Sequence, residues 1–316
     1  MTFSLAPLAG FTDAPFRRLC AEGGADMAYT EMVSAAGLSH GSSPTRHLME
    51  RMDGEGPVAC QIFGAKETDV AFAARVVPGG FCQLNLNAGC PMAKVTREGA
   101  GAKLMEDPAK IYRLVKAMAE NTALPVTVKT RIGPRPGWLN AMEILDAVQS
   151  AGAKGIVVHA RYTSQMHGGE VHLDVLEDIV RHAEIPVVGN GGVRDRKTAK
   201  EMEKTGVAGI MVGRAALANP SVFRLLKGED ASVDPVEACR THLEYILGFR
   251  LLLERKYPLD HIPGEDGFAS VKMHTHLFRY FSGRPGAAAL RARLNQVRTL
   301  GEIREILCAL ASRNMV

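Results

Sequence analysis

One cysteine lies in a turn that suits a reactive thiol. Cys90 belongs to the segment 87–91, Asn-Ala-Gly-Cys-Pro, directly after an apolar run, and the glycine-containing segment 98–102 follows it. A thiol with a reference pKa of about 8.5 is mostly protonated near neutral pH, so it can donate a proton without special tuning. We expect the other cysteines to be small buried apolar residues: Cys20, Cys60, Cys82, Cys239 and Cys308.

Polar and charged residues close almost every apolar run of the first 214 residues. Lys129 and Arg131 are two positions apart, so their side chains lie on one face of an extended strand. Two cations aimed at one place indicate an anionic or electron-rich ligand. His159 alone would more often be a structural histidine than a catalytic one, but its position at a strand end reverses that preference. The run-closing residues are Pro7, Glu31, Gln61, Asn85, Asn87, Lys129, Arg131, His159, Arg161, Asn190, Gly213 and Arg214.

Two glycine turns predict a phosphate site. Residues 190–193, Asn-Gly-Gly-Val, and 213–216, Gly-Arg-Ala-Ala, follow the last two apolar runs. Backbone N–H groups at such turns and at helix starts hold phosphate, with Arg214 as a charged donor. In barrels of alternating strands and helices, the loops after strands seven and eight commonly form this site.

The elements that must position these residues are eight short apolar runs, each followed by a segment with helical spacing. The regular repetition predicts a closed (β/α)8 TIM barrel, and an open doubly wound sheet is the less favoured alternative. Asp107 and Asp195 are expected to cap two of the helices. The predicted strands are 3–8, 26–31, 57–63, 82–87, 125–131, 155–160, 186–190 and 208–212.

From residue 234 onward the pattern is helical and predicts a second domain. We therefore expect a catalytic barrel at 1–233 and a small helical bundle at 234–316, and we expect Pro258, Pro263, Pro285 and Gly301 to separate its helices. The predicted helices are 235–256, 266–282, 286–296 and 301–312.

The net charge of +4 arises in residues 235–316, which carry twelve Lys and Arg against eight Asp and Glu. Such a basic cluster is suited to gripping phosphates. Its densest part comprises Lys272, Arg279, Arg284, Arg291, Arg293, Arg298, Arg304 and Arg313, opposed by Glu302 and Glu305.

Composition narrows the class of protein further. Apolar residues make up 46% and charged residues 23%, the balance of a globular chain that buries a core. No secretion signal or membrane-spanning run is recognisable, and the cysteines form neither a zinc pattern nor a disulfide framework. We therefore expect a cytoplasmic protein with no metal and no membrane partner, and a monomer.

Taken together, these segments resemble the tRNA-dihydrouridine synthases, in the expected order over residues 5–225, and the basic helical tail resembles that family's RNA-recognition domain. The departures are Asn85 and Gly192, each where an aspartate is common, and His159-Ala-Arg-Tyr162 in place of His-Gly-Arg-Thr. The segments that carry the resemblance are Ala6-Pro-Leu-Ala-Gly-Phe-Thr-Asp-Ala-Pro-Phe-Arg17, Asn85-Leu-Asn-Ala-Gly-Cys-Pro91, Val128-Lys-Thr-Arg-Ile-Gly133, His159-Ala-Arg161, Val188-Gly-Asn-Gly191 and Ile210-Met-Val-Gly-Arg214.

The resemblance implies an FMN-dependent oxidoreductase that reduces the uracil C5–C6 double bond in tRNA, with NADPH as reductant. It implies that Cys90 is the catalytic acid at C5, that Asn87 and Arg131 hold the base, and that the tail residues Lys272, Arg279 and Arg291 bind RNA. The implied flavin-binding residues are Pro7, Leu8, Ala9, Gln61, Lys129, His159, Asn190, Gly191, Gly192, Gly213 and Arg214.

Three other functions remain open on the sequence. An FMN barrel of the dihydroorotate dehydrogenase type would act on a free metabolite, but such a ligand needs no phosphate-gripping tail. A dihydrouridine synthase acting on another RNA is a second alternative. An RNA-binding protein that has lost catalysis is the third, and the intact Cys90, Lys129, Arg131 and His159 speak against it.

Overall fold

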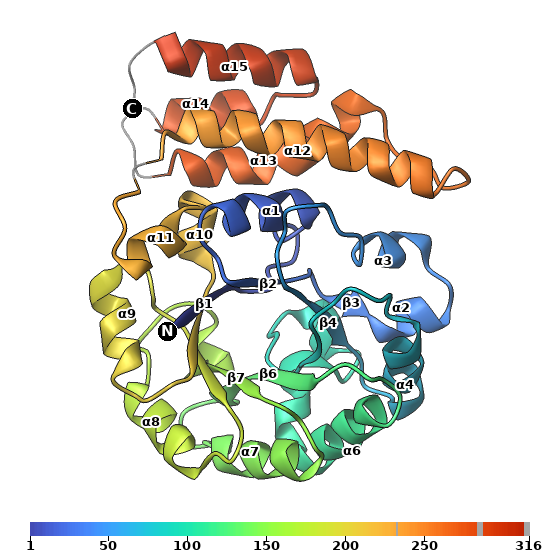
Figure 1. Ribbon diagram of the computed structural model, residues 1–316, viewed down its shortest axis with the longest axis vertical. Coiled ribbons are helices and arrows are strands. Elements are labelled where there is room, and N and C mark those ends of the chain that lie inside the picture. Colours follow the sequence, from blue (N-terminus) through green and yellow to red (C-terminus); the bar gives the residue numbers. More distant parts are fainter. Residues whose placement is uncertain (232, 283–286, 313–316) are drawn as a thin grey trace.

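The computed structural model describes residues 1–231, 233–282 and 287–312 and shows a closed barrel of eight parallel strands (Figure 1). All eight predicted strands are present. The structure adds a two-residue strand, β3, which pairs only with the rim end of β4. The strands are β1 (Thr2–Leu5), β2 (Met27–Tyr29), β3 (Val33–Ser34), β4 (Val58–Phe63), β5 (Gln83–Asn87), β6 (Val126–Gly133), β7 (Ile156–Tyr162), β8 (Val187–Asn190) and β9 (Gly209–Val212).

Helices surround this barrel between successive strands, as Figure 1 shows. Asp107 caps α6 by accepting from Lys110 N–H at 3.0 Å, and Asp195 caps α9 in a capping box with Thr198, so both predicted caps are confirmed. The helices are α1 (Ala14–Glu22), α2 (Ala35–Ser39), α3 (Ser43–His47), α4 (Glu67–Val76), α5 (Ala93–Thr96), α6 (Pro108–Ala119), α7 (Ala141–Ser150), α8 (Leu173–His182), α9 (Arg196–Glu203), α10 (Arg214–Ala218) and α11 (Val222–Lys227), with 3₁₀ turns at Gly101–Glu106 and Thr163–Gln165.

Side chains alternate strictly between the two faces of the barrel wall, as the two-residue period of a strand requires. The outward residues, such as Leu84 and Leu86 of β5, pack against the helices in one large apolar core. A small separate cluster fills the interior, so the barrel is packed and has no open channel. Its members are Ala6, Tyr29, Ala59, Val157 and Met211. Chemistry is therefore confined to the ends of the barrel.

The C-terminal helices lie together on one side of the barrel (Figure 1). They are α12 (Pro235–Lys256), α13 (Glu265–Tyr280), α14 (Ala287–Leu294) and α15 (Leu300–Ser312), close to the predicted bounds. Gly301 does not separate helices, because it lies in the first turn of α15, while Pro285 falls outside the described residues. We retain 1–233 and 234–316 as the proposed division into domains.

The helical domain is joined to the barrel mainly through α1, which packs against α12. Lys256 of α12 binds Glu50 of the barrel at 2.7 Å, and Tyr245 donates to Glu22 at 2.8 Å. Buried His242 and His276 pack around Phe16 of α1, with ring centroids 5.5 and 4.7 Å away.

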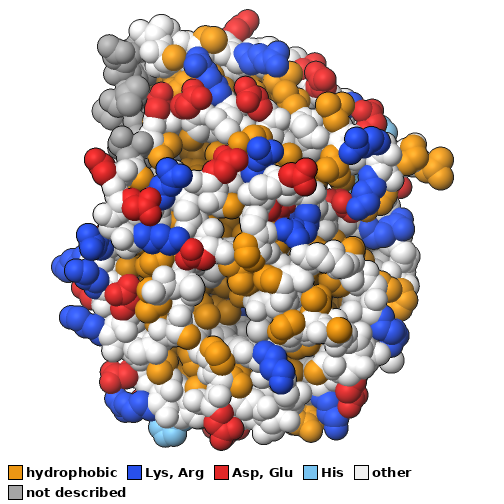
Figure 2. All heavy atoms as spheres, in the orientation of Figure 1, with side chains coloured by type: hydrophobic (Ala, Val, Ile, Leu, Met, Phe, Trp, Pro, Cys, Tyr) orange, Lys and Arg blue, Asp and Glu red, His pale blue; other side chains and the backbone are white. Residues whose placement is uncertain are grey.

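Acidic and basic side chains are interspersed over the face shown in Figure 2, including its helical part, and no large patch of one sign is visible there. Within the described part of the chain, no helix is long and apolar enough to cross a bilayer.

Candidate active site at the barrel rim

The inward positions change from apolar to polar at the carboxyl ends of the strands. Lys129 pairs in register with Asn87, and Arg131 pairs with His159, which in turn pairs with Asn190. Five neighbouring strands therefore bring their functional side chains to one rim, as the strand-end pattern predicts. The inward polar residues of β4 to β8 are Gln61, Asn85, Asn87, Thr127, Lys129, Arg131, His159, Arg161 and Asn190.

Buried amides form a continuous hydrogen-bonded chain below this rim. Gln61 Nε2 donates to Asn85 Oδ1 at 2.7 Å, and Asn85 Nδ2 donates to Thr127 Oγ1 at 2.8 Å. Asn87 Nδ2 donates to Gln61 Oε1 at 2.9 Å. Because each amide satisfies another, the layer holds its side chains in fixed orientations.

Cys90 lies in a turn whose backbone is held by two rim side chains. Asn87 Oδ1 accepts from the N–H groups of Gly89, at 3.1 Å, and Cys90, at 2.9 Å. Arg131 Nε donates to the Gly89 carbonyl at 3.0 Å, and its Nη1 donates to the Tyr162 carbonyl at 3.2 Å. Asn87 and Arg131 therefore fix the loop that presents the thiol.

The Cys90 thiol is half-buried and favours its protonated form. Burial raises its pKa above the ordinary value, and this effect outweighs the opposing influence of Arg131 and Lys129. A protonated thiol at a partly open position suits a proton donor rather than a nucleophile.

Lys129 links β6 to β8 across the rim. Its Nζ donates to Asn190 Oδ1 at 3.1 Å, and Asn190 Nδ2 donates to the Met211 carbonyl of β9 at 2.8 Å. Burial, with a further contribution from Arg131, lowers the pKa of Lys129 to about 7. Near neutral pH, part of the population is therefore the neutral amine, which is poised to gain a proton when an anion arrives.

His159 is neutral in this surrounding. Burial, followed by the charges of Lys129 and Arg131, drives its pKa far below the usual range. Arg161 Nη1 lies 3.2 Å from His159 Nε2, which orients the ring. An uncharged imidazole here can exchange hydrogen bonds with a ligand but cannot act as a cationic acid at neutral pH.

The rim carries several cations that form no ion pair within the described part of the chain. Among the ion pairs of the described residues, none involves Lys129, Arg131, Arg161 or Arg214. These charges act on one another: burial, followed by the charge of Arg214, lowers the pKa of Arg161. A group of cations without counter-ions at one end of a barrel favours the binding of an anionic ligand.

The glycine turns after β8 and β9 lie at the same rim. Gly191 has φ +116°, and a Cβ there would approach His159 Cδ2 to 2.7 Å. Gly213 faces the first loop of the barrel, since a Cβ there would lie 3.8 Å from Leu8 Cδ2. Arg214 opens α10 with an exposed side chain. The backbone of these turns and Arg214 thus lie together at this rim, where the absence of a Cβ at Gly191 lets the backbone approach His159 closely.

Sequence reasoning missed His167. It lies in the loop after β7, its ring stacks on His159 at 6.3 Å between centroids, and the rim arginines and Lys129 add to burial in lowering its pKa. Nothing marked it in the sequence, because it follows the strand by five residues and its position depends on the path of the loop. Met166 beside it has φ +53°, a left-handed conformation unusual for methionine.

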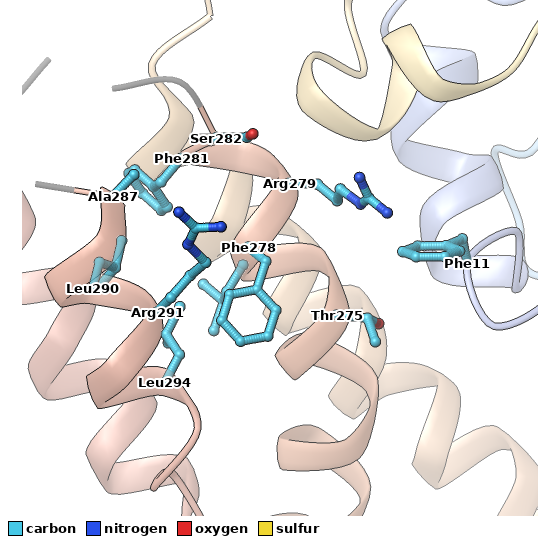
Figure 3. Close-up of a pocket in the computed structure, with 11 residues that line it drawn as sticks. Phe11, Thr275, Phe278, Arg279, Phe281, Ser282, Ala287, Leu290, Arg291 and Leu294 are labelled. Atoms are coloured by element: carbon cyan, nitrogen blue, oxygen red, sulfur yellow. The ribbon is translucent and has the colours of Figure 1, made fainter. Parts of the chain in front are cut away.

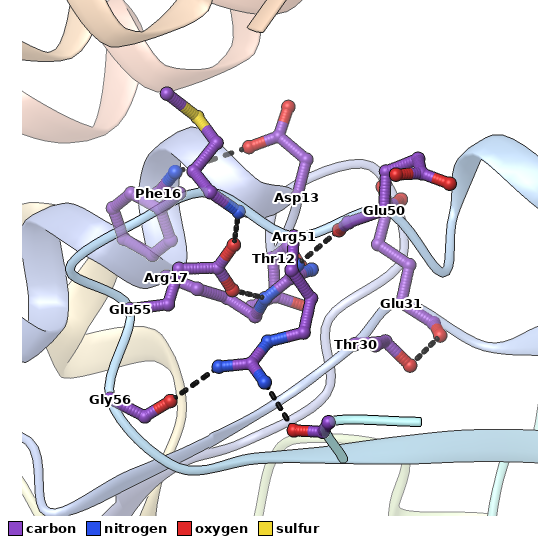
Figure 4. A network of polar contacts seen from close by, with 12 residues as sticks. Thr12, Asp13, Phe16, Arg17, Thr30, Glu31, Glu50, Arg51, Glu55 and Gly56 are labelled. Atoms are coloured by element: carbon purple, nitrogen blue, oxygen red, sulfur yellow. Dashed lines mark hydrogen bonds and ion pairs between the residues drawn. The ribbon is translucent and has the colours of Figure 1, made fainter. Parts of the chain in front are cut away.

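A buried ion pair braces the first loop of the rim, residues 6–13 (Figure 4). Arg17 Nε binds Glu55 Oε2 at 2.6 Å with neither side chain exposed. Its other nitrogens donate to the carbonyls of Thr12, at 2.9 Å, and Glu50, at 2.7 Å. This loop contains Pro7, Leu8 and Ala9, so the ion pair fixes the segment predicted to face the flavin.

The predicted RNA-binding cations are not equivalent. Lys272 pairs with buried Asp13 at 3.0 Å and holds α13 to the barrel, and its contact with RNA stays a prediction. Arg279 and Arg291 are exposed. Arg284 and Arg313 fall outside the described residues.

Two expected core cysteines, Cys82 and Cys308, are exposed, so that part of the cysteine prediction was wrong.

The fold and the arrangement of the rim place the chain among the (β/α)8 barrel enzymes. In this class the reactive groups and the phosphate-binding loops lie together at the carboxyl ends of the strands. The chain belongs to the dihydrouridine synthase (Dus) family, whose model matches residues 4–315. The family is one of oxidoreductases, so this protein is an enzyme of that class.

Similar proteins include a probable tRNA-dihydrouridine synthase of Treponema pallidum, 38% identical over 69% of this chain and 68% of the relative. A tRNA-dihydrouridine synthase B of Pseudomonas putida is 32% identical over 92% of this chain and 86% of the relative. The structure titled "Crystal structure of TcOYE with pHBA" shares the barrel fold, with a TM-score of 0.51, 10% identity, and coverage of 73% of this chain and 90% of that chain.

Proposed function

We propose that this protein is a tRNA-dihydrouridine synthase that uses FMN to reduce the C5–C6 double bond of uracil. The observation that carries the proposal is the group of unpaired cations beside the glycine turns, with Cys90 held at the same rim. Family membership supports the flavin and the reaction. NADPH as the source of reducing equivalents, and action in the cytoplasm, are further parts of the proposal.

The rim residues fit FMN. The amides of Gly191, Gly192 and Gly213, with Arg214, would hold the phosphate, because a Cβ at Gly191 would fill the space beside His159. His159 and Asn190 would complete this region. Lys129 would lie at the polar edge of the isoalloxazine, where a cation favours the anionic reduced flavin. Gln61 would bind the same edge, while Pro7, Leu8 and Ala9 would contact the ring face.

When bound, FMN supplies the hydride for uracil C6, and the protein must supply the proton for C5. The raised pKa of Cys90 keeps that proton on its sulfur near neutral pH. Arg131 would hold the base, since its guanidinium has N–H donors beyond those that bind Gly89 and Tyr162. Asn87 would contact the base through Nδ2, whose second partner is only the Met32 sulfur at 3.0 Å.

The tRNA would be bound by the helical domain. A uridine must leave its stack to reach a barrel rim, which costs a few kcal/mol that backbone contacts must offset. The exposed guanidiniums of Arg279 and Arg291 are suited to this role. Recognition of tRNA shape and phosphates is sufficient to fix which uridine is presented.

The reaction is tested by mapping dihydrouridine in RNA from cells with and without the gene, which reports substrate and position together. In vitro, we expect Cys90→Ala to bind flavin and tRNA normally but to reduce uridine about 100-fold more slowly or worse, the usual loss for a missing general acid. Cys82→Ala, which removes an exposed thiol, is the matched control and should keep full activity. Wild-type turnover by Cys90→Ala would refute the assignment of the acid.

A further inference from the structure

A groove of about 320 Å³ is lined by residues of α13 and α14 and by Phe11 of the first rim loop (Figure 3). Buried Leu277, Phe281 and Leu294 form its floor. Phe278 of α13 and Arg291 of α14 lie beside each other in its middle, as Figure 3 shows. The volume is at the lower end of the range of small-ligand pockets, about 300 to 1,000 Å³.

The lining combines aromatic rings with guanidinium groups and has no acidic residue among its described members. Arg279 stacks over the ring of Phe11, with its Cζ 5.8 Å from the centroid. Neither Arg279 nor Arg291 takes part in an ion pair of the described residues. Aromatic faces bind bases by stacking, and unpaired arginines bind phosphates, so the groove is complementary to one nucleotide.

The groove is also close to the rim along the chain. Phe11, which lines the groove, belongs to the same loop as Leu8, which lies near Gly213 of the rim. A hydrogen bond of 3.0 Å from Phe11 N–H to the Leu8 carbonyl closes a turn between them. One short turn therefore connects the proposed flavin site to the groove, with Arg279 at the junction.

We propose that the groove binds one unpaired nucleotide of the RNA substrate, a neighbour of the uridine that enters the barrel. Its base stacks on Phe278 above the apolar floor, and Arg279 and Arg291 bind its phosphate. The inference rests on the proposed function and adds to it a second anchor, which holds the RNA strand in register while the uridine is out of its stack.

Binding of unmodified tRNA to the holoenzyme tests the two halves of the groove separately. Loss of one stacked base by Phe278→Ala should weaken binding roughly 5- to 150-fold, with an unchanged dependence on salt. Arg291→Ala should reduce the slope of log affinity against log salt by about one. Arg304→Ala removes an exposed cation of α15 outside the groove and should change the affinity less than Arg291→Ala does. Equal losses from both arginine variants would overturn the proposal.

A cycle that combines the protein variant with base-free nucleotides in the tRNA identifies the occupant. At one position beside the target uridine, removal of the base should weaken wild-type binding but should not weaken Phe278→Ala further. Phe278→Trp keeps an aromatic face, so removal of the same base should weaken its binding as it weakens wild-type binding. This result would show that the altered response of Phe278→Ala does not come from a folding defect. Losses that are additive at every position would refute a base in the groove.

Failure of the groove and failure of the proposed function are distinguishable. If wild-type enzyme forms dihydrouridine in tRNA but the losses in the cycle are additive, the proposed function stands and only the proposal about the groove is refuted. Wild-type enzyme that forms no dihydrouridine in any tRNA, with reduced FMN bound, refutes the proposed function on which the groove depends.

Discussion

Substitution of Lys129 tests the electrostatic basis of the proposed flavin site. The pKa of this lysine is lowered to about 7 by burial and by Arg131, so about half of the cofactor-free molecules lack the charge at neutral pH. A bound anion next to Nζ should restore the proton. Between pH 7 and 9, FMN binding by the wild-type protein therefore takes up a proton, and the affinity should fall about 50-fold over that range.

No other rim group is expected to titrate in this window. The pKa of His159 lies far below it, burial raises the pKa of Cys90 above its ordinary value, and Arg131 has a pKa of about 10. A phosphate monoester, with its second pKa near 6, is already a dianion. The fall in affinity should therefore belong to Lys129, and Lys129→Met should bind FMN weakly with little dependence on pH.

The assay is titration of FMN into apoprotein by flavin fluorescence at constant ionic strength, at several values between pH 7 and 9. Lys197→Met removes an exposed lysine of α9 and should keep the wild-type fall in affinity. The apoprotein should also become more stable as the pH rises above 7, because the unfolded lysine holds its proton while the folded one releases it. A wild-type affinity that is constant over this range would refute the reasoning.

Three further outcomes are expected. Gly191→Ala should lose FMN binding at least tenfold, because its φ of +116° strains any side chain and the new Cβ meets His159; an unchanged dissociation constant would remove the turn from the site. Arg17→Met should lower the free energy of unfolding by about 3 to 5 kcal/mol in a denaturant titration, because buried Glu55 loses its partner. Arg18→Met, in an exposed pair, should change it by less than about 1 kcal/mol, and similar values for both would contradict the distinction.

The barrel was predictable because its strands are buried on both faces. Such strands appear in the sequence as short apolar runs, and the segments between them have the residue spacing of amphipathic helices. The small strand β3 was not predictable, since two residues carry no periodicity. Gly301 was wrongly predicted to separate two helices. A glycine in the first turn of a helix destabilises the helix little, so the sequence does not distinguish it from a glycine in a loop.

The candidate site was predictable to the extent that a rule about strand ends determines it. Lys129, Arg131 and His159 meet because parallel strands end together. Their partners depend on register and loop path, which the sequence does not contain. Lys272 shows the difference: its charge suggested RNA, and its ion pair with Asp13, which joins α13 to the barrel, had no signal in the sequence.

The first rim loop, residues 6–13, connects the two halves of the proposed mechanism. At its start, Leu8 lies beside the glycine turn of β9, and at its end Asp13 caps α1 and binds Lys272 of the helical domain. Arg17 holds the same loop from beneath through the Thr12 carbonyl (Figure 4). A shift of the helical domain would therefore pull on the segment proposed to face the flavin. The proposed RNA site and the proposed flavin site are thus held in one fixed relation, because a single braced loop belongs to both.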